Sequence, residues 1–70
     1  MEIIFTKHAQ KRMVERNIEL ESIKDTLSFP DYSIKKGEKF EVYKKINNKK
    51  LKIVYCNTGK FIKIITLIWK

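Results

Sequence analysis

The sequence predicts a single α+β domain in which two N-terminal helices pack on an antiparallel sheet of three or four strands. Apolar residues recur at helical spacing before Pro30, whereas apolar and polar residues alternate after it. Turn residues such as Asn and Gly separate the alternating segments. A chain of 70 residues buries only about 60% of its unfolded surface, so we assign residues 1–70 to one compact domain.

The first helix is expected from Lys7 to about Arg16. Thr6 offers a hydroxyl as its N-cap, and Asn17 suits the left-handed conformation that often follows a helix. The short apolar segment of residues 2–5 is compatible with an edge strand before this helix.

The second helix is expected from about Glu19 to Ser28, and Pro30 lies just beyond its end. It has no strong N-cap, although its acidic residues favour the positive end of the helix dipole. Its apolar residues recur at spacings of three and four: Leu20, Ile23 and Leu27.

The rest of the chain is expected to form a meander of strands. Residues 40–46, 51–56 and 61–69 alternate or are continuously apolar, and residues 32–36 are a candidate for one more strand. In the first of these, one face is predicted to carry Phe40, Val42 and Ile46, and the other Glu41, Tyr43 and Lys45. The last segment is apolar on both faces, which predicts a buried strand. Its two faces are expected to carry Ile62, Ile64 and Ile68, and Phe61, Ile65 and Leu67.

Charge is concentrated in the C-terminal half. Residues 1–31 contain five basic and six acidic residues, whereas residues 32–70 contain eleven basic and two acidic residues. The net charge of +8 favours a polyanionic partner and a fast encounter with it. A generally lysine-rich, well-solvated surface is the alternative explanation.

Several classes of site are not expected. Cys56 is the only cysteine, so no internal disulfide forms, and with a single histidine we expect no metal site and no cofactor. Cys56 is expected to be a small buried residue. The start lacks a signal-peptide pattern, and no segment approaches the roughly eighteen apolar residues that span a bilayer. We therefore expect a cytoplasmic protein.

Two arginines stand out among fourteen lysines. His8, Arg12 and Arg16 are spaced by four residues, which places them within an arc of roughly 80° on one side of the first helix. We name these three residues the cationic edge. Arginine binds phosphate through two parallel hydrogen bonds, and histidine titrates near neutral pH. The alternative is structural, with the arginines tying the helix to the sheet or to a chain terminus.

Residues 8–18 carry a resemblance to a known family. The segment His8-Ala9-Gln10-Lys11-Arg12-Met13-Val14-Glu15-Arg16-Asn17-Ile18 resembles the pattern His-Ala-x-x-Arg-Met-x-x-Arg-Gly/Asn-Ile. This pattern belongs to a small bacterial and archaeal domain family of unknown function, which is similar to the RelE and BrnT toxins. The resemblance implies a RelE-like fold and RNA cleavage restrained by an antitoxin. One departure is Trp69, where such families tend to have a tyrosine. An indole cannot transfer a proton as a tyrosine hydroxyl can, so the departure affects any catalytic role of this residue.

The chemistry of metal-free RNA cleavage suits this set of residues. It requires a base, an acid and fixed positive charge on the phosphorane. We assign acid or base chemistry to His8 and charge stabilisation to Arg12 and Arg16, with Glu15 as a residue that can orient them or pair with a lysine. Four further residues are predicted to bind RNA: Lys11, Tyr43, Lys45 and Lys52.

The sequence thus favours a metal-independent endoribonuclease toxin that acts on mRNA, with or without the ribosome, and has an antitoxin as its partner. Two alternatives stay open. One is a nucleic-acid-binding module without catalysis, and the other is a basic domain that binds an acidic protein.

Overall fold

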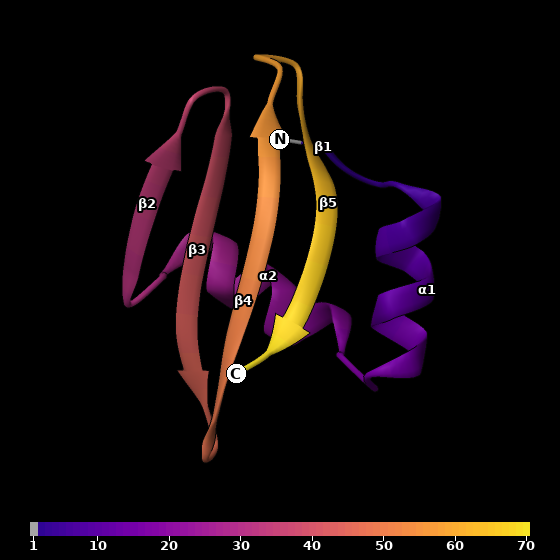
Figure 1. Cartoon of the computed structure of the whole chain (residues 1–70), viewed down its shortest axis with the longest axis vertical. Coiled ribbons are helices and arrows are strands. Elements are labelled where there is room, and N and C mark those ends of the chain that lie inside the picture. Colours follow the sequence, from indigo (N-terminus) through magenta and orange to yellow (C-terminus); the bar gives the residue numbers. More distant parts are fainter. Residues whose placement is uncertain (1) are drawn as a thin grey trace.

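The computed structural model describes residues 2–70, which form two helices and one five-stranded sheet (Figure 1). The α+β class and both helices are therefore confirmed, but the sheet is larger than the predicted three or four strands. The elements in chain order are β1 (Glu2–Phe5), α1 (Lys7–Glu15), α2 (Leu20–Ser28), β2 (Tyr32–Lys36), β3 (Lys39–Ile46), β4 (Lys49–Asn57) and β5 (Phe61–Trp69).

The sheet is mixed, with the strand order β1-β5-β4-β3-β2. Strands β2 to β5 form the predicted antiparallel meander, whereas β1 pairs in parallel with β5, from Glu2 opposite Phe61 to Phe5 opposite Ile64. The candidate edge strand of residues 2–5 is therefore present, but its parallel pairing was not predicted. The two strands come from opposite ends of the chain, and local patterning carries no information on which distant strands pair.

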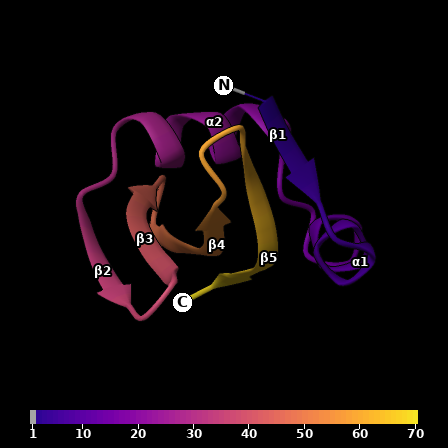
Figure 2. The ribbon, with the colours of Figure 1, turned by 90° about the horizontal axis from the view of Figure 1, so that it is seen from above.

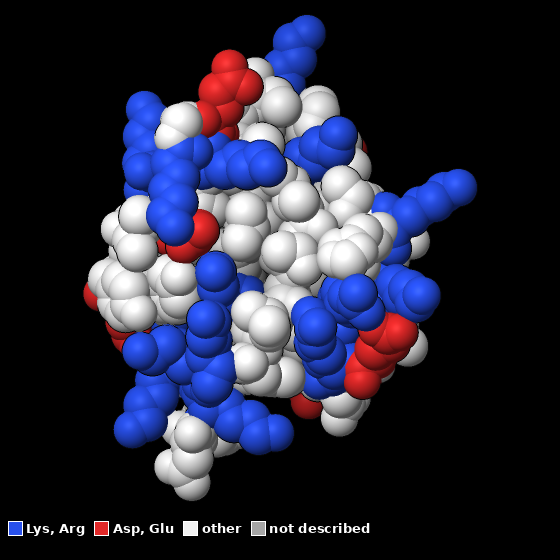
Figure 3. Space-filling model, viewed as in Figure 1, with Lys and Arg blue, Asp and Glu red and all other residues white. Residues whose placement is uncertain are grey.

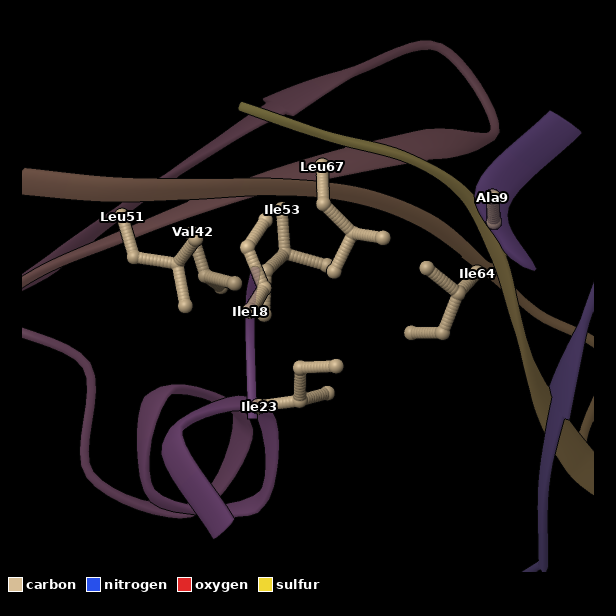
Figure 4. Packing of buried hydrophobic residues seen from close by; sticks show 8 residues of the cluster. All are labelled: Ala9, Ile18, Ile23, Val42, Leu51, Ile53, Ile64 and Leu67. Atoms are coloured by element: carbon tan, nitrogen blue, oxygen red, sulfur yellow. The ribbon is translucent and has the colours of Figure 1, made fainter. Parts of the chain in front are cut away.

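One face of the sheet carries the core. Figure 2 shows the sheet curving around α2, while α1 lies to the side, next to β1 and β5. Ile23 of α2 is fully buried, and Figure 4 shows its side chain directed toward residues of the sheet. The buried cluster consists of Ala9, Ile18, Ile23, Val42, Leu51, Ile53, Ile64 and Leu67.

The helix ends agree with the sequence. The Thr6 hydroxyl accepts a hydrogen bond from the Ala9 backbone N–H at 3.0 Å and caps α1. Asn17 has a φ of 53°, in the left-handed region. Glu19 precedes α2 without a side-chain capping bond, as its sequence predicts. These local signals determine where the chain turns between α1 and α2.

A bulge in β5 changes the predicted faces of that strand. Val54 lies opposite Thr66 and Tyr55 lies opposite Ile64, so one extra residue, Ile65, stands between them in β5. Ile64 and Leu67, three residues apart, are therefore both fully buried on the α2 side. The predicted alternation is wrong beyond Ile64, because strict alternation assumes a regular ladder.

Candidate nucleic-acid interface

Helix α1 covers the edge of β5 where β1 ends. The strand β1 pairs with β5 only as far as Ile64, which leaves the following backbone groups of β5 without a strand partner on that side. Thr6 takes up two of them: its N–H donates to the Ile64 carbonyl at 3.1 Å, and its hydroxyl donates to the Ile65 carbonyl at 3.2 Å. The first turn of α1 is thereby fixed to the sheet.

The last turn of α1 is fixed by two reciprocal hydrogen bonds. Arg16 Nη1 donates to the Leu67 carbonyl oxygen, and Trp69 Nε1 donates to the Arg16 carbonyl oxygen at 2.8 Å. We name this pair of contacts the Arg16–Trp69 latch. Both contacts are partly buried, and the guanidinium of Arg16 binds the edge of β5. For Arg16 this is the predicted structural alternative, in which an arginine ties the helix to the sheet.

Arg12 has a different environment. Its Nη1 lies 2.6 Å from Glu15 Oε1, and the two side chains are 32% and 45% exposed. The hydrogen bond from Arg12, followed by the charges of Arg12, Lys11 and Arg16, lowers the pKa of Glu15. Because a guanidinium has five N–H donors, this pair leaves Arg12 able to contact a phosphate.

The structure therefore divides the cationic edge. Arg16 is directed at β5, whereas His8 is exposed in the first turn of α1 and Arg12 remains on the outer surface. Lys11 is exposed between them. The outer surface of α1 thus presents two of the three predicted residues, and the third holds the helix in place.

A second basic surface lies on the sheet. The face opposite α2 is not covered by either helix among the described residues, and we name it the open face (Figures 1 and 3). Cross-strand register places six lysines on it, together with the acidic residues Glu2 and Glu41. These lysines are Lys36, Lys39, Lys45, Lys50, Lys52 and Lys63. Figure 3 shows basic side chains around an uncharged centre on this side of the molecule.

The open face contains a stacked pair of tyrosines. The rings of Tyr32 and Tyr43 are 4.6 Å apart between centroids and inclined by 13°. Tyr43 is only 8% exposed because Tyr32 covers it, and Tyr32 itself is 45% exposed. Burial, together with the hydrogen bond to Glu41, raises the pKa of Tyr43. Tyr43, which the sequence predicts to bind RNA, is thus largely covered, and Tyr32 is the accessible ring of the pair.

Glu41 lies at the centre of a small charged network. Its Oε1 accepts a hydrogen bond from the Tyr43 hydroxyl at 2.9 Å and lies 3.8 Å from Lys52 Nζ. Its Oε2 lies 3.4 Å from Lys36 Nζ. The Tyr43 hydrogen bond, and then the charges of the two lysines, lower the pKa of Glu41. Glu41 was not predicted as a site residue, and it orients the predicted Lys52.

The remaining predicted residues take simple positions. Lys45 is exposed on the open face, one residue pair away from the end of β3. Cys56 is partly exposed on the same face, so the prediction that it is buried is wrong. Lys45 and the partly covered Lys52 thus both contribute positive charge to the open face.

Comparison with known proteins gives a family match. A family model described as a domain of unknown function, DUF4258, matches residues 5–69. No curated protein and no solved structure matches the chain. Within residues 2–70, neither helix has the length and apolar character that crossing a membrane requires.

Proposed function

The chain belongs to the DUF4258 family of domains of unknown function, and for this member we propose RNA binding through the open face and the outer surface of α1. One observation carries the proposal. Six lysines from four strands share an uncovered sheet face that holds two carboxylates, and one of these, Glu41, is already paired with two lysines.

Electrostatics and aromatic chemistry both favour nucleic acid as the ligand. Lysines that neutralise phosphates release counterions, which drives binding in a salt-dependent manner. Tyr32 adds an exposed ring beside Lys50, whose Nζ lies 5.4 Å from the ring centroid. A ring beside cationic groups is the combination that binds bases and phosphates together. The charges of Arg12 and Lys11 on α1 extend the same positive field.

A titration at several salt concentrations tests this proposal. If four phosphates of a single strand are neutralised, the affinity should fall about 50-fold between roughly 50 and 200 mM salt. Lys45→Gln and Lys50→Gln should each lower the slope of this dependence. Lys24→Gln is the matched control, because Lys24 lies on α2 at the other side of the sheet. A flat salt response would refute phosphate binding and would favour an acidic protein as the partner.

RNA cleavage is the second candidate, and the exposure of His8 together with Arg12 favours it. His8 can accept or donate the proton, while Arg12 can stabilise charge on the phosphorane. This activity corresponds to a metal-independent endoribonuclease toxin with RelE-like architecture, acting on mRNA in the cytoplasm and inhibited by an antitoxin.

Purified protein and a labelled RNA, with and without ribosomes, test cleavage directly. Products ending in a 2′,3′-cyclic phosphate in the presence of a chelator are expected, because the 2′-hydroxyl is the nucleophile in the metal-free reaction. Binding without cleavage under all these conditions would support the non-catalytic module.

A further inference from the structure

The open face has an internal order that goes beyond its net charge. Cross-strand pairing connects Lys36 to Lys39, Lys39 to Cys56 and Cys56 to Lys63, so three lysines lie in one row across the sheet. We name this the first lysine row. It runs across the four strands β2 to β5 at the end of the sheet where the β2–β3 turn lies.

A second lysine row lies near the other end of the strands. It consists of Lys45, Lys50 and Lys70. Lys45 pairs with Lys50, and Lys50 exchanges both backbone hydrogen bonds, at 2.7 and 3.3 Å, with Lys70, which follows β5 and adds one lysine to the six that lie on the strands. Along β3, Lys39 and Lys45 are six residue steps apart, so the two rows are separated by about 20 Å.

Uncharged side chains fill most of the space between the two rows, and the charged residues there, Glu41 and Lys52, are paired with each other. Ile34, Val54 and Ile68 occupy this part of the open face by register, and Ile34 is 39% exposed. Tyr32 lies in the same zone, with its ring supported from below by Tyr43. Figure 3 shows this uncharged zone between basic side chains.

We propose that the open face binds single-stranded RNA, with bases against Tyr32, Ile34 and Ile68 and phosphates at the two lysine rows. The inference rests on the proposed RNA binding and adds the strand state of the ligand. A duplex keeps its bases stacked inside, so it would contact the lysines but leave the uncharged zone unfilled. A single strand can turn its bases onto that zone, because every base has an apolar face.

The position of Glu41 supports this arrangement of bases at the centre and phosphates at the two ends. Glu41 lies between the rows, where it binds Lys36 and Lys52 and accepts from the Tyr43 hydroxyl. Its carboxylate offsets the charge of these two lysines, which makes the centre of the open face less attractive to phosphate. The lysines of the two rows that Glu41 does not bind keep their positive charge for the backbone: Lys39, Lys63, Lys45, Lys50 and Lys70.

Fluorescence anisotropy with one labelled RNA of about 12 nucleotides, alone and annealed to its complement, tests the proposal. The single strand should bind at least about tenfold more tightly than the duplex. Tyr32→Ala should weaken single-strand binding on the order of tenfold, the usual effect of losing one stacked base, and change duplex binding little. Tyr32→Phe should retain full binding, because it keeps the ring and loses only the hydroxyl near Lys50.

Phe29→Ala is the matched control, because Phe29 is an aromatic residue that is 72% exposed at the end of α2, outside the sheet. It should bind like the parent protein. If circular dichroism shows that Tyr32→Ala disturbs the fold, Ile34→Ser supplies a second test, and it should also weaken single-strand binding.

Two results would overturn the inference while leaving RNA binding in place. These are equal or tighter binding of the duplex, and unchanged single-strand binding by folded Tyr32→Ala and Ile34→Ser variants. A parent protein that binds neither form of RNA at low salt would instead refute the proposed function itself.

Discussion

Replacing Arg16 with methionine should destabilise the fold far more than the same change at Arg12. Methionine is unbranched, packs in the same space as the aliphatic part of arginine and removes every N–H donor. At residue 16 the change leaves the partly buried Leu67 carbonyl without its charged donor. At residue 12 it breaks only an exposed pair with Glu15.

The size of the difference follows from these contacts. A hydrogen bond from a charged group contributes about 1.5–3 kcal/mol to the free energy of unfolding. In a domain of 70 residues each kcal/mol shifts the melting temperature by roughly 4–8 °C, so Arg16→Met should lower it by about 6–24 °C. Arg12→Met should stay within about 3 °C, because exposed pairs contribute little.

Thermal unfolding by circular dichroism, with urea titration as a second measure, gives both values. Trp69→Phe removes the other half of the latch and should lower stability by about 1 kcal/mol through its hydrogen bond. The double variant with Arg16→Met should show a coupling of at least about 0.5 kcal/mol, since both bonds join the same helix end to β5. Equal melting temperatures for Arg16→Met and Arg12→Met would show that the latch does not stabilise the fold.

Three further predictions concern chemistry and pH. His8→Gln should lower RNA cleavage by about 10² to 10⁴-fold with folding unchanged, and full activity would place the proton transfer elsewhere. Arg12→Lys should keep the fold and lose much of the activity, because an ammonium cannot make the paired hydrogen bonds of a guanidinium; parallel loss of stability would make Arg12 structural. The pKa of Glu41 is lowered from 4.5, so its ionised form stabilises the fold above that pH and this contribution is lost as the pH falls below it. Urea titrations between about pH 7 and 3 should therefore show that the free energy of unfolding falls less on acidification in Glu41→Gln than in the parent protein. Identical pH profiles of the two proteins would argue against the network.

Local features of the fold could be predicted because they depend on neighbouring residues. The N-cap at Thr6 and the left-handed Asn17 follow from side-chain and backbone preferences that act within a few residues. The alternation of Val42 and Tyr43 likewise assigns them to opposite faces of β3. Such signals need no knowledge of the rest of the chain.

Features that depend on distant pairing could not be predicted in this way. The parallel pairing of β1 with β5 and the bulge at Ile65 both require the register between separated segments. The same limit applied to the site: Tyr32 covers Tyr43 only because β2 pairs with β3 in that register. The accessible aromatic was therefore assigned one strand away from where it lies.

Helix α1 can both cover the edge of β5 and present His8 and Arg12 to a ligand. An uncovered strand edge would offer its backbone to other chains, and α1 covers the edge of β5 with Thr6 and Arg16. Fixing residue 16 also determines the rotation of the helix, which turns Ala9 into the core and leaves His8 and Arg12 outside.

Arg16 should then affect RNA only through the fold. At a temperature well below its transition, where Arg16→Met is folded, its RNA affinity should match that of the parent protein within about twofold. Arg12→Met should bind more weakly at the same temperature although it melts higher, because a lost phosphate contact lowers affinity without touching the core. The two variants would thus rank in opposite order for stability and for binding. If folded Arg16→Met also loses affinity, its guanidinium contacts RNA as well as Leu67, and the whole cationic edge acts as one site.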